Sequence, residues 1–437
     1  MKERTLNELR QVKEYGWKPK PTEDLVKKLD DAIKAEINSK QDQVAQKLDM
    51  ILDLEDIIQT EMVKAGLHPE EYPDHEFELQ EAFKELFEYA KNSGKVVGYE
   101  VDDLTFGPRG IFYENGNHNV SDAIDEQIRD ADFVTTTTQS LQKELADLRG
   151  SYDNIYIIRN RVDLDALSEL VDAPIQHENR PDKKIRVGWA GAGYHLKRIY
   201  GVKEAYRDIN SQNPGKVTFV FKGIDEDNLK SSQDAETLRS LKQYFDDNSI
   251  DYEFHGYTPQ KDWTDYYKSL KDLNVDIFHA PGGIDSEYVG KSELKYLEAA
   301  IAGAPIVTQD IGGHGEVIEH KVNGMLIPAN QQTRGFTDCI DELINDPELR
   351  NKIARNARYN LINEYDVRKS SHELAGGFRE QLTRNGKLEG RVNSSKIDNS
   401  NHLAILMGSP GTGKSTVARK LCDEGYNQFS LDGIIHG

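Results

Sequence analysis

Apolar residues recur with a helical period through the first 92 residues of the chain. Leucine and isoleucine lie at intervals of four over residues 25–37, and further apolar stripes follow over 44–62 and 77–89. Charged residues fill the positions between them, as on the solvent face of an amphipathic helix. The pattern predicts a helical leader over residues 1–92, either a hairpin packed on the next domain or a coiled coil through which chains oligomerise.

The pattern changes at residue 93, where short apolar runs begin to alternate with amphipathic stretches. The apolar runs predict strands, and the amphipathic stretches predict helices between them. We expect strands at 96–101, 133–136 and 155–158, and helices at 120–132 and 140–148. Such alternation is typical of a parallel sheet, so residues 93–172 are predicted to form a partial α/β domain.

The same alternation returns after a polar, proline-containing linker at 173–184 and continues much further. It indicates a second, larger α/β domain over 183–382. Strands are expected at 185–190, 217–221, 252–256, 275–279 and 306–308. Helices are expected at 199–209, 265–270, 293–301, 336–344, 347–364 and 365–382. Gly303 is placed to cap the helix 293–301, and Pro305 prevents that helix from continuing.

Composition narrows the class of function. The chain of 437 residues carries 55 basic and 76 acidic residues, a formal charge of −21. This balance argues against non-specific binding to nucleic acid or to a membrane surface as the main activity. Cys339 and Cys422 are too few for a disulfide framework or a zinc site. No apolar run is long enough to span a membrane and no signal peptide is apparent, so a cytoplasmic location is expected.

Glycine-rich turns follow two of the predicted strands in the larger domain. Gly191 and Gly193 follow the strand 185–190, and Gly312 and Gly313 follow the strand 306–308. Backbone N–H groups at such turns, and the start of a following helix, can bind phosphate at the carboxyl ends of parallel strands. Glu298 lies on the helix before the second turn, where its carboxylate could accept from ribose hydroxyls. We therefore predict a nucleotide-sugar site.

The stretch 291–327 resembles the nucleotide-binding half of the retaining GT-B glycosyltransferases, the glycogen-synthase-like group 1 family. That family typically shows a Leu-Glu-Ala run followed by Gly and Pro, a Gly-Gly-x-x-Glu turn, and Asn-Gly before a strand. The matching residues here are Leu297–Ala300, Gly303, Pro305, Gly312, Gly313, Glu316, Asn323 and Gly324. The family often has a second glutamate eight residues before Glu298, where this chain has Gly290.

Ser292 and Lys295 occupy the turn between these two positions, as in a variant of phage and bacterial relatives. Lys295 is accordingly either a phosphate contact or a surface lysine. The variant also has a G-W-A-G-x-x-x-H pattern, which Gly188, Gly191 and His195 match. In the family, basic residues in this region neutralise the donor diphosphate, so after His195 the next donor-site candidates are Lys197 and Arg198, which could instead be a solvated helix start. Lys222 at the end of the strand 217–221 is another phosphate candidate. The predicted donor-binding residues are Gly191, Gly193, His195, Lys197, Lys222, Ser292, Lys295, Glu298, Gly312 and Gly313.

The resemblance implies a GT-B-like α/β fold with two Rossmann-like units and a retaining, metal-independent sugar transfer. The first unit is incomplete, because the helical leader stands where the family has further strands and its acceptor loop. No catalytic residue is assigned. His118, in a Gly-Asn-rich loop, is either a catalytic candidate or a loop histidine without a catalytic role, and Tyr257 is a candidate for stacking on the base. The acceptor could be a glycan, a protein or a nucleic acid.

A second motif follows a Ser/Asn-rich linker at 383–401. Residues 402–437 read as a strand, a glycine loop and the start of a helix, and Gly408–Ser415 fits G-x-x-x-x-G-K-S/T fully. In such a P-loop Lys414 would contact the β- and γ-phosphates and Ser415 would ligate Mg²⁺. The predicted ATP-binding residues are Gly408, Gly411, Gly413, Lys414, Ser415, Thr416 and Asp432.

The flanks of this motif resemble P-loop polynucleotide kinases. In those enzymes an aspartate after the second strand contacts the acceptor hydroxyl or Mg²⁺, and the resemblance implies that role for Asp432. The sequence ends at Gly437, before the further strands that a kinase domain needs, so a truncated bifunctional protein is expected. Mg-ATP would bind at the P-loop if the kinase domain is complete in the full-length protein. Two alternatives to a glycosyltransferase remain open: a kinase on a transferase-like scaffold, and a non-catalytic nucleotide-sugar-binding module.

Overall fold

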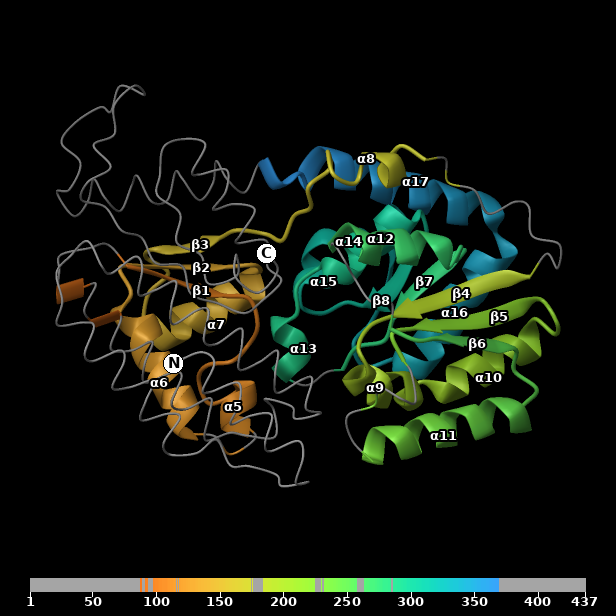
Figure 1. The fold of residues 1–437 in the computed structure, drawn as a ribbon, viewed down its shortest axis with the longest axis horizontal. Coiled ribbons are helices and arrows are strands. Elements are labelled where there is room, and N and C mark those ends of the chain that lie inside the picture. Colours follow the sequence, from red (N-terminus) through yellow and green to blue (C-terminus); the bar gives the residue numbers. More distant parts are fainter. Residues whose placement is uncertain are drawn as a thin grey trace, which may run out of the picture. The chain divides into compact units, whose positions relative to one another are not determined.

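The computed structural model describes residues 97–173, 184–224, 232–257, 263–283 and 286–368, apart from Asn115 and Asn117, and residues 87, 88, 91, 92, 175 and 229. They fall into two compact units (Figure 1). The first contains the described residues up to Thr136 and Leu141–Ile158; the second contains Thr137–Ser140 and the described residues from Arg159 onward. Almost all of the predicted leader, and the whole P-loop segment, lie outside the described residues.

The first unit is a three-stranded parallel sheet with helices between its strands. Its strands are β1 (Gly98–Val101), β2 (Phe133–Thr136) and β3 (Ile155–Ile157), in that order across the sheet. Its helices are α5 (Ile111–Glu114), α6 (His118–Asp130) and α7 (Gln139–Arg149), whose first two residues belong to the second unit. The strands and helices predicted from the alternation of apolar runs are confirmed to within a few residues.

The second unit is built on six parallel strands in the order β6-β5-β4-β7-β8-β9. They are β4 (Ile185–Ala190), β5 (Val217–Lys222), β6 (Tyr252–His255), β7 (Ile277–Ala280), β8 (Ile306–Gln309) and β9 (Met325–Ile327). The strand order reverses between β4 and β7, and in such sheets ligands bind beyond the carboxyl ends of the strands at the reversal. The predicted strands of this unit are therefore confirmed, and β9 completes the sheet.

Two layers of helices bury opposite faces of this sheet. Phe219 and Phe221 of β5 point into one core, and Val220 between them points into the other. The first core is covered by α9 (Leu196–Gly201), α10 (Lys203–Gln212), α11 (Ser232–Asp247) and α16 (Gln332–Asn345). The second is covered by α8 (Ser168–Val171), α12 (Trp263–Asp272), α14 (Leu294–Ala302) and α17 (Pro347–Glu364). Figure 1 shows two short helices, α13 (Ser286–Gly290) and α15 (Gly312–Val317), on the side to which the strand arrows point.

Two local predictions differ from the structure. The helix expected at 199–209 is divided into two helices. The first ends at Gly201, and Val202, with φ −112°, then turns its side chain into the core. Gly312 and Gly313 do not form a turn before a helix; they are the first residues of α15 itself. The predicted cap of α14 is confirmed, since Gly303 has φ 85° and donates its N–H to the carbonyl of Ala299.

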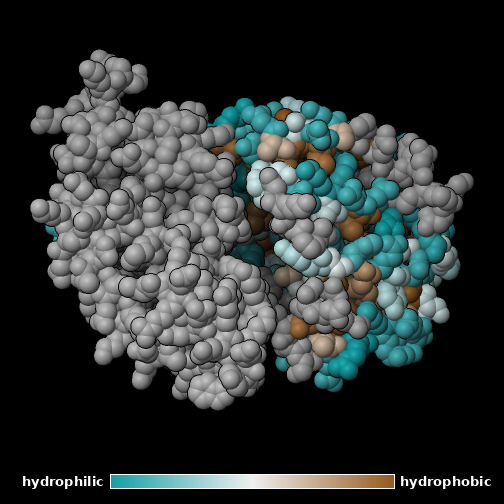
Figure 2. Space-filling view, viewed as in Figure 1, coloured by the Kyte–Doolittle hydropathy of each residue, from teal (hydrophilic) through white to brown (hydrophobic). Residues whose placement is uncertain are grey.

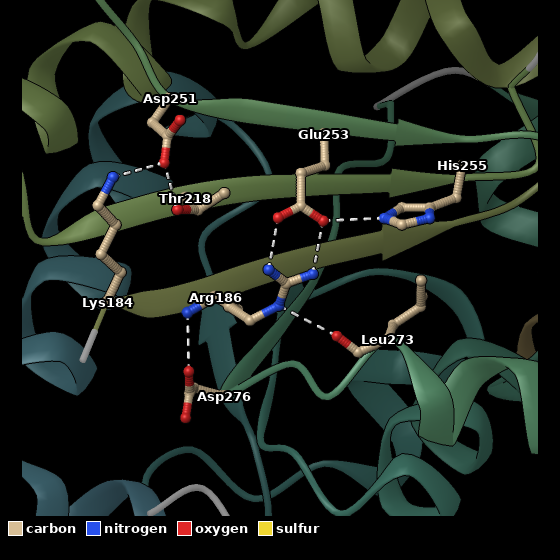
Figure 3. A network of polar contacts seen from close by, with 8 residues as sticks. All are labelled: Lys184, Arg186, Thr218, Asp251, Glu253, His255, Leu273 and Asp276. Atoms are coloured by element: carbon tan, nitrogen blue, oxygen red, sulfur yellow. Dashed lines mark hydrogen bonds and ion pairs between the residues drawn. The ribbon is translucent and has the colours of Figure 1, made fainter. Parts of the chain in front are cut away.

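A ladder of ion pairs crosses β4, β5 and the edge strand β6 (Figure 3). The guanidinium of Arg186 forms two hydrogen bonds with the carboxylate of Glu253, at 2.6 and 2.7 Å, and Lys184 pairs with Asp251 at 2.8 Å. The bonds from Arg186 are the main reason why the pKa of Glu253 falls to about 2. Charged groups along an edge strand discourage pairing with another sheet, so this network has a structural role.

Hydrophilic residues form most of the coloured surface in Figure 2, and hydrophobic residues occur there in small separate patches. Among the described residues, no helix combines the length and the apolar composition needed to cross a membrane.

Candidate functional site

The loops that follow β4 and β5 are in direct contact. The N–H of Gly191 donates to the carbonyl of Lys222 at 3.1 Å, and the N–H of Gly223 donates to that of His255 at 2.9 Å. Gly223 has φ 87°, and a Cβ atom there would lie 2.1 Å from the carbonyl oxygen of Gly191. Only glycine fits this close approach. The backbone contact therefore holds the start of the loop 191–193 at the carboxyl ends of β4 and β5.

The positive charges of four basic side chains lower the pKa of His195, which lies at the end of that loop. Two follow it in α9 and two lie on the segment around the start of α14: Lys197, Arg198, Lys291 and Lys295. We call these five residues the basic cluster. Arg198 places its guanidinium carbon 5.0 Å from the ring centre of Tyr288, in a cation–π contact. Residues nearly 100 positions apart in the sequence thus gather beyond the carboxyl ends of β4 and β7.

His195 is neutral in this setting. Burial, and then the positive charges of its four neighbours, lower its pKa to about 3. The expectation that His195 adds positive charge to the site therefore needs correction. Its ring can exchange hydrogen bonds with a phosphate, while the charge comes from the lysines and Arg198.

Lys222 is not among the cations that act on His195. It is the last residue of β5, it is 7% exposed, and the charge acting on it is that of Asp272 at the end of α12. Burial lowers its pKa. Lys291, which was not predicted, is among the cations that lower the pKa of His195, and Lys222 stays a predicted phosphate contact at the end of β5.

Glu298 is nearly enclosed and forms an ion pair with Lys295. The side chain lies on α14 and the residue is 7% exposed, with its two carboxylate oxygens 2.8 and 3.0 Å from the Lys295 ammonium. Tyr266 and Tyr267 of α12 lie close enough for the charge of Glu298 to help raise their pKa values, after burial. A carboxylate has about four acceptor positions, so Glu298 keeps the capacity to accept from a ligand hydroxyl.

The two glycines at the start of α15 allow close packing. Gly313 donates its N–H to the carbonyl of Lys291 at 2.9 Å, so this N–H is already engaged. A Cβ atom on Gly313 would lie 2.8 Å from the backbone nitrogen of Glu293, and one on Gly312 would lie 2.9 Å from the Lys291 oxygen. The role of these glycines is therefore to bring α15 against the segment that carries Lys291 and the half-buried Ser292.

Glu316, the acid of the Gly-Gly-x-x-Glu motif, binds two distant segments of the second unit. It accepts hydrogen bonds from the backbone N–H groups of Gln139 and Ser140, both at 2.9 Å, and from Arg159 at 2.8 Å. Arg159 also lies 3.6 Å from Glu293, which is fully buried. Burial is the main reason why the pKa of Glu293 rises to about 7. No sequence pattern indicated this cluster.

Other candidates lie elsewhere or outside the described residues. Tyr257 follows β6 and is 59% exposed. His118 does not lie in a loop, as expected, but opens α6, where its ring packs edge-on against Tyr113. The predicted ATP and Mg²⁺ residues, from Gly408 to Asp432, are not among the described residues.

A family model and two curated relatives match part of this chain. Residues 172–359 match the family model for glycosyl transferases group 1. A putative glycosyltransferase of Bacillus subtilis, YtcC, is 27% identical over 206 residues, which cover 47% of this chain and 47% of YtcC. A glycogen synthase of Mycobacterium tuberculosis is 24% identical over 266 residues, 58% of each chain. The matches thus span about half the length of these relatives.

Solved structures share the fold. The Anabaena protein HepE, in complex with UDP-glucose, superposes with a TM-score of 0.51 at 20% identity, over 69% of this chain and 77% of HepE. A sucrose-phosphate synthase from Thermosynechococcus elongatus gives 0.50 at 14% identity, over 73% and 81%. Residues 172–359 are therefore similar to the group 1 glycosyltransferase domain, and the GT-B-like parallel α/β fold predicted from the sequence is confirmed for the described residues.

Proposed function

We propose that this chain is a glycosyltransferase that moves a sugar from a nucleotide-sugar donor to an acceptor. The basic cluster carries the proposal. In a chain with a formal charge of −21, four cations gather around one neutral histidine where the strand order reverses. Such a concentration of positive charge suits a diphosphate. The match to group 1 glycosyl transferases supports the same assignment.

The site would act mainly through electrostatics. As the bond between the sugar and the diphosphate breaks, negative charge develops on the departing diphosphate. Lys291, Lys295 and Arg198 would stabilise that charge, and the neutral ring of His195 would donate a hydrogen bond. Glu298 would hold the ribose hydroxyls and fix the donor in a reactive orientation. Retention of configuration and independence of a metal ion are proposed from the family resemblance, and the acceptor would be a glycan, a protein or a nucleic acid.

The test is to measure binding and turnover with UDP- and GDP-sugars. Calorimetry should detect binding of at least one donor, and release of the nucleoside diphosphate should follow slowly in water and faster with an acceptor. Binding without any release would instead favour a non-catalytic nucleotide-sugar-binding module. Absence of binding to every donor would reject the proposal.

A second nucleotide site is proposed from the motif Gly408–Ser415. Its glycines, Lys414 and Ser415 are the groups that hold the phosphates and Mg²⁺ of ATP in P-loop proteins. A fluorescent ATP analogue should bind in the presence of Mg²⁺, and Lys414→Ala should abolish that binding while leaving nucleotide-sugar binding unchanged. Equal binding by the variant would remove this proposal.

A further inference from the structure

His314 is a buried, uncharged side chain at the edge of the basic cluster. It lies on α15, next to Gly313, and is 2% exposed. Its ring centre is 6.5 Å from that of Tyr288, the ring on which Arg198 is placed. Burial, and then the charge of Lys295, lower the pKa of His314 to about 4, so the ring is neutral at physiological pH.

Thr308 determines which nitrogen of that ring carries the proton. The Thr308 hydroxyl donates to the carbonyl of Ala280 at 3.0 Å, and the same oxygen lies 3.5 Å from Nδ1 of His314. A hydroxyl has one proton to donate, so the contact with Nδ1 requires the ring to be the donor. Nε2 is then an acceptor.

This acceptor has no hydrogen-bond partner among the described residues. Buried polar atoms are rarely left in that state, so the arrangement points to a donor group supplied by a ligand. The oxygens of an ionised diphosphate only accept, and they cannot satisfy Nε2. A hydroxyl group can. Lys295, the cation that acts on His314, is assigned to the diphosphate, and the proposed ribose contact, Glu298, is a separate residue of α14.

We propose that Nε2 of His314 accepts a hydrogen bond from a hydroxyl of the transferred sugar and so contributes to the choice of donor. This inference rests on the proposed function and deepens it, because it assigns one residue to the sugar itself. Nothing in it depends on the nucleoside base. It predicts that a change at His314 separates the affinity for the nucleotide sugar from the affinity for the nucleoside diphosphate.

Two amide substitutions provide a matched pair. In His314→Gln the amide reaches the place of Nε2 and can still accept there, whereas in His314→Asn it reaches only the place of Nδ1. Calorimetry with UDP, GDP, UDP-glucose and GDP-mannose should show diphosphate affinities unchanged in both variants. His314→Asn should bind the sugar-bearing donor about five- to tenfold more weakly than the wild-type protein, and His314→Gln should stay within about twofold of it.

Unchanged diphosphate affinity also shows that the variants are folded. The inference is overturned if His314→Asn binds the sugar-bearing donor like the wild-type protein, or if it loses affinity for diphosphate and donor equally. The second result would assign His314 to the nucleotide. If the wild-type protein binds neither diphosphate nor sugar-bearing donor, the proposed function itself fails, and that outcome is recognised before any variant is measured.

Discussion

Lys295 places its ammonium nitrogen 2.8 Å from one carboxylate oxygen of Glu298 and 3.0 Å from the other. The two residues are three positions apart on α14 and only 9% of the Glu298 side chain is exposed. The ammonium that would contact the diphosphate is thus the partner of the carboxylate that would hold the ribose. A substitution of either residue therefore also removes the ion-pair partner of the other and affects both halves of the proposed donor site.

Removing the Glu298 carboxylate should weaken donor binding. A hydrogen bond to a charged group contributes about 1.5–3 kcal/mol, so Glu298→Ala should lower the affinity for the nucleoside diphosphate by about 10- to 100-fold. Isothermal titration calorimetry measures this directly. Glu348→Ala, an exposed position in the first turn of α17, is the control and should bind normally. An unchanged affinity in Glu298→Ala would show that the site has been placed wrongly.

Lys295→Gln should weaken binding and stability by separate routes. Loss of the ammonium should lower diphosphate affinity by about tenfold, with less effect on a nucleoside that lacks phosphate. It also leaves Glu298 buried without its cation, which should cost about 1–3 kcal/mol of unfolding free energy. The double variant with Glu298→Gln should recover stability but not affinity. Lys352→Gln, exposed on α17, changes the net charge equally and should alter neither property. If the double variant stayed as unstable as Lys295→Gln, the ion pair would not explain the loss.

Glu293 should make stability fall as the pH rises. Its folded-state pKa of about 7 lies above the ordinary value of 4.5, because burial favours the protonated form. The stability that this group contributes is therefore complete below pH 4.5 and is lost as the pH rises through 7. Glu293→Gln should raise the unfolding free energy by about 1–3 kcal/mol at pH 8 and change it little at pH 4.5. Arg159 keeps Glu316 as its partner in this variant.

Urea unfolding of the wild-type protein and Glu293→Gln at several pH values tests this expectation. Glu348→Gln removes an exposed carboxylate and should show the pH dependence of the wild-type protein. Parallel curves for the wild-type protein and Glu293→Gln would mean that the buried carboxylate does not titrate in this range.

Gly223→Ala should be far more harmful than Gly215→Ala. Both glycines have positive φ, 87° and 71°, so both substitutions carry a backbone cost of about 1 kcal/mol. Only at Gly223 would the new Cβ meet backbone, at 2.1 Å from the Gly191 oxygen; at Gly215 it would meet nothing within 4 Å. Gly223→Ala should therefore cost about 2–4 kcal/mol in thermal or urea unfolding and also weaken donor binding, since the loop at Gly191 must move. Equal costs for the two variants would contradict this explanation.

The sequence by itself determined the α/β class, most strand and helix positions, and the stretch around Glu298. It could do so because these depend on local periodicity and on glycine and proline, which act within a few residues. It also indicated His195, Lys197 and Lys295 as neighbours of one ligand, and the structure places both lysines beside His195.

The tertiary structure decided what depends on contacts between distant segments. It added Lys291 to the cations around His195, and it buried the side chain of Lys222 near Asp272. It made His195 neutral through burial and neighbouring charge, and it gave Gly313 a packing role against Glu293. Protonation states and close approaches depend on the groups that surround a residue in space. The pattern of residues along the chain does not show which groups those are.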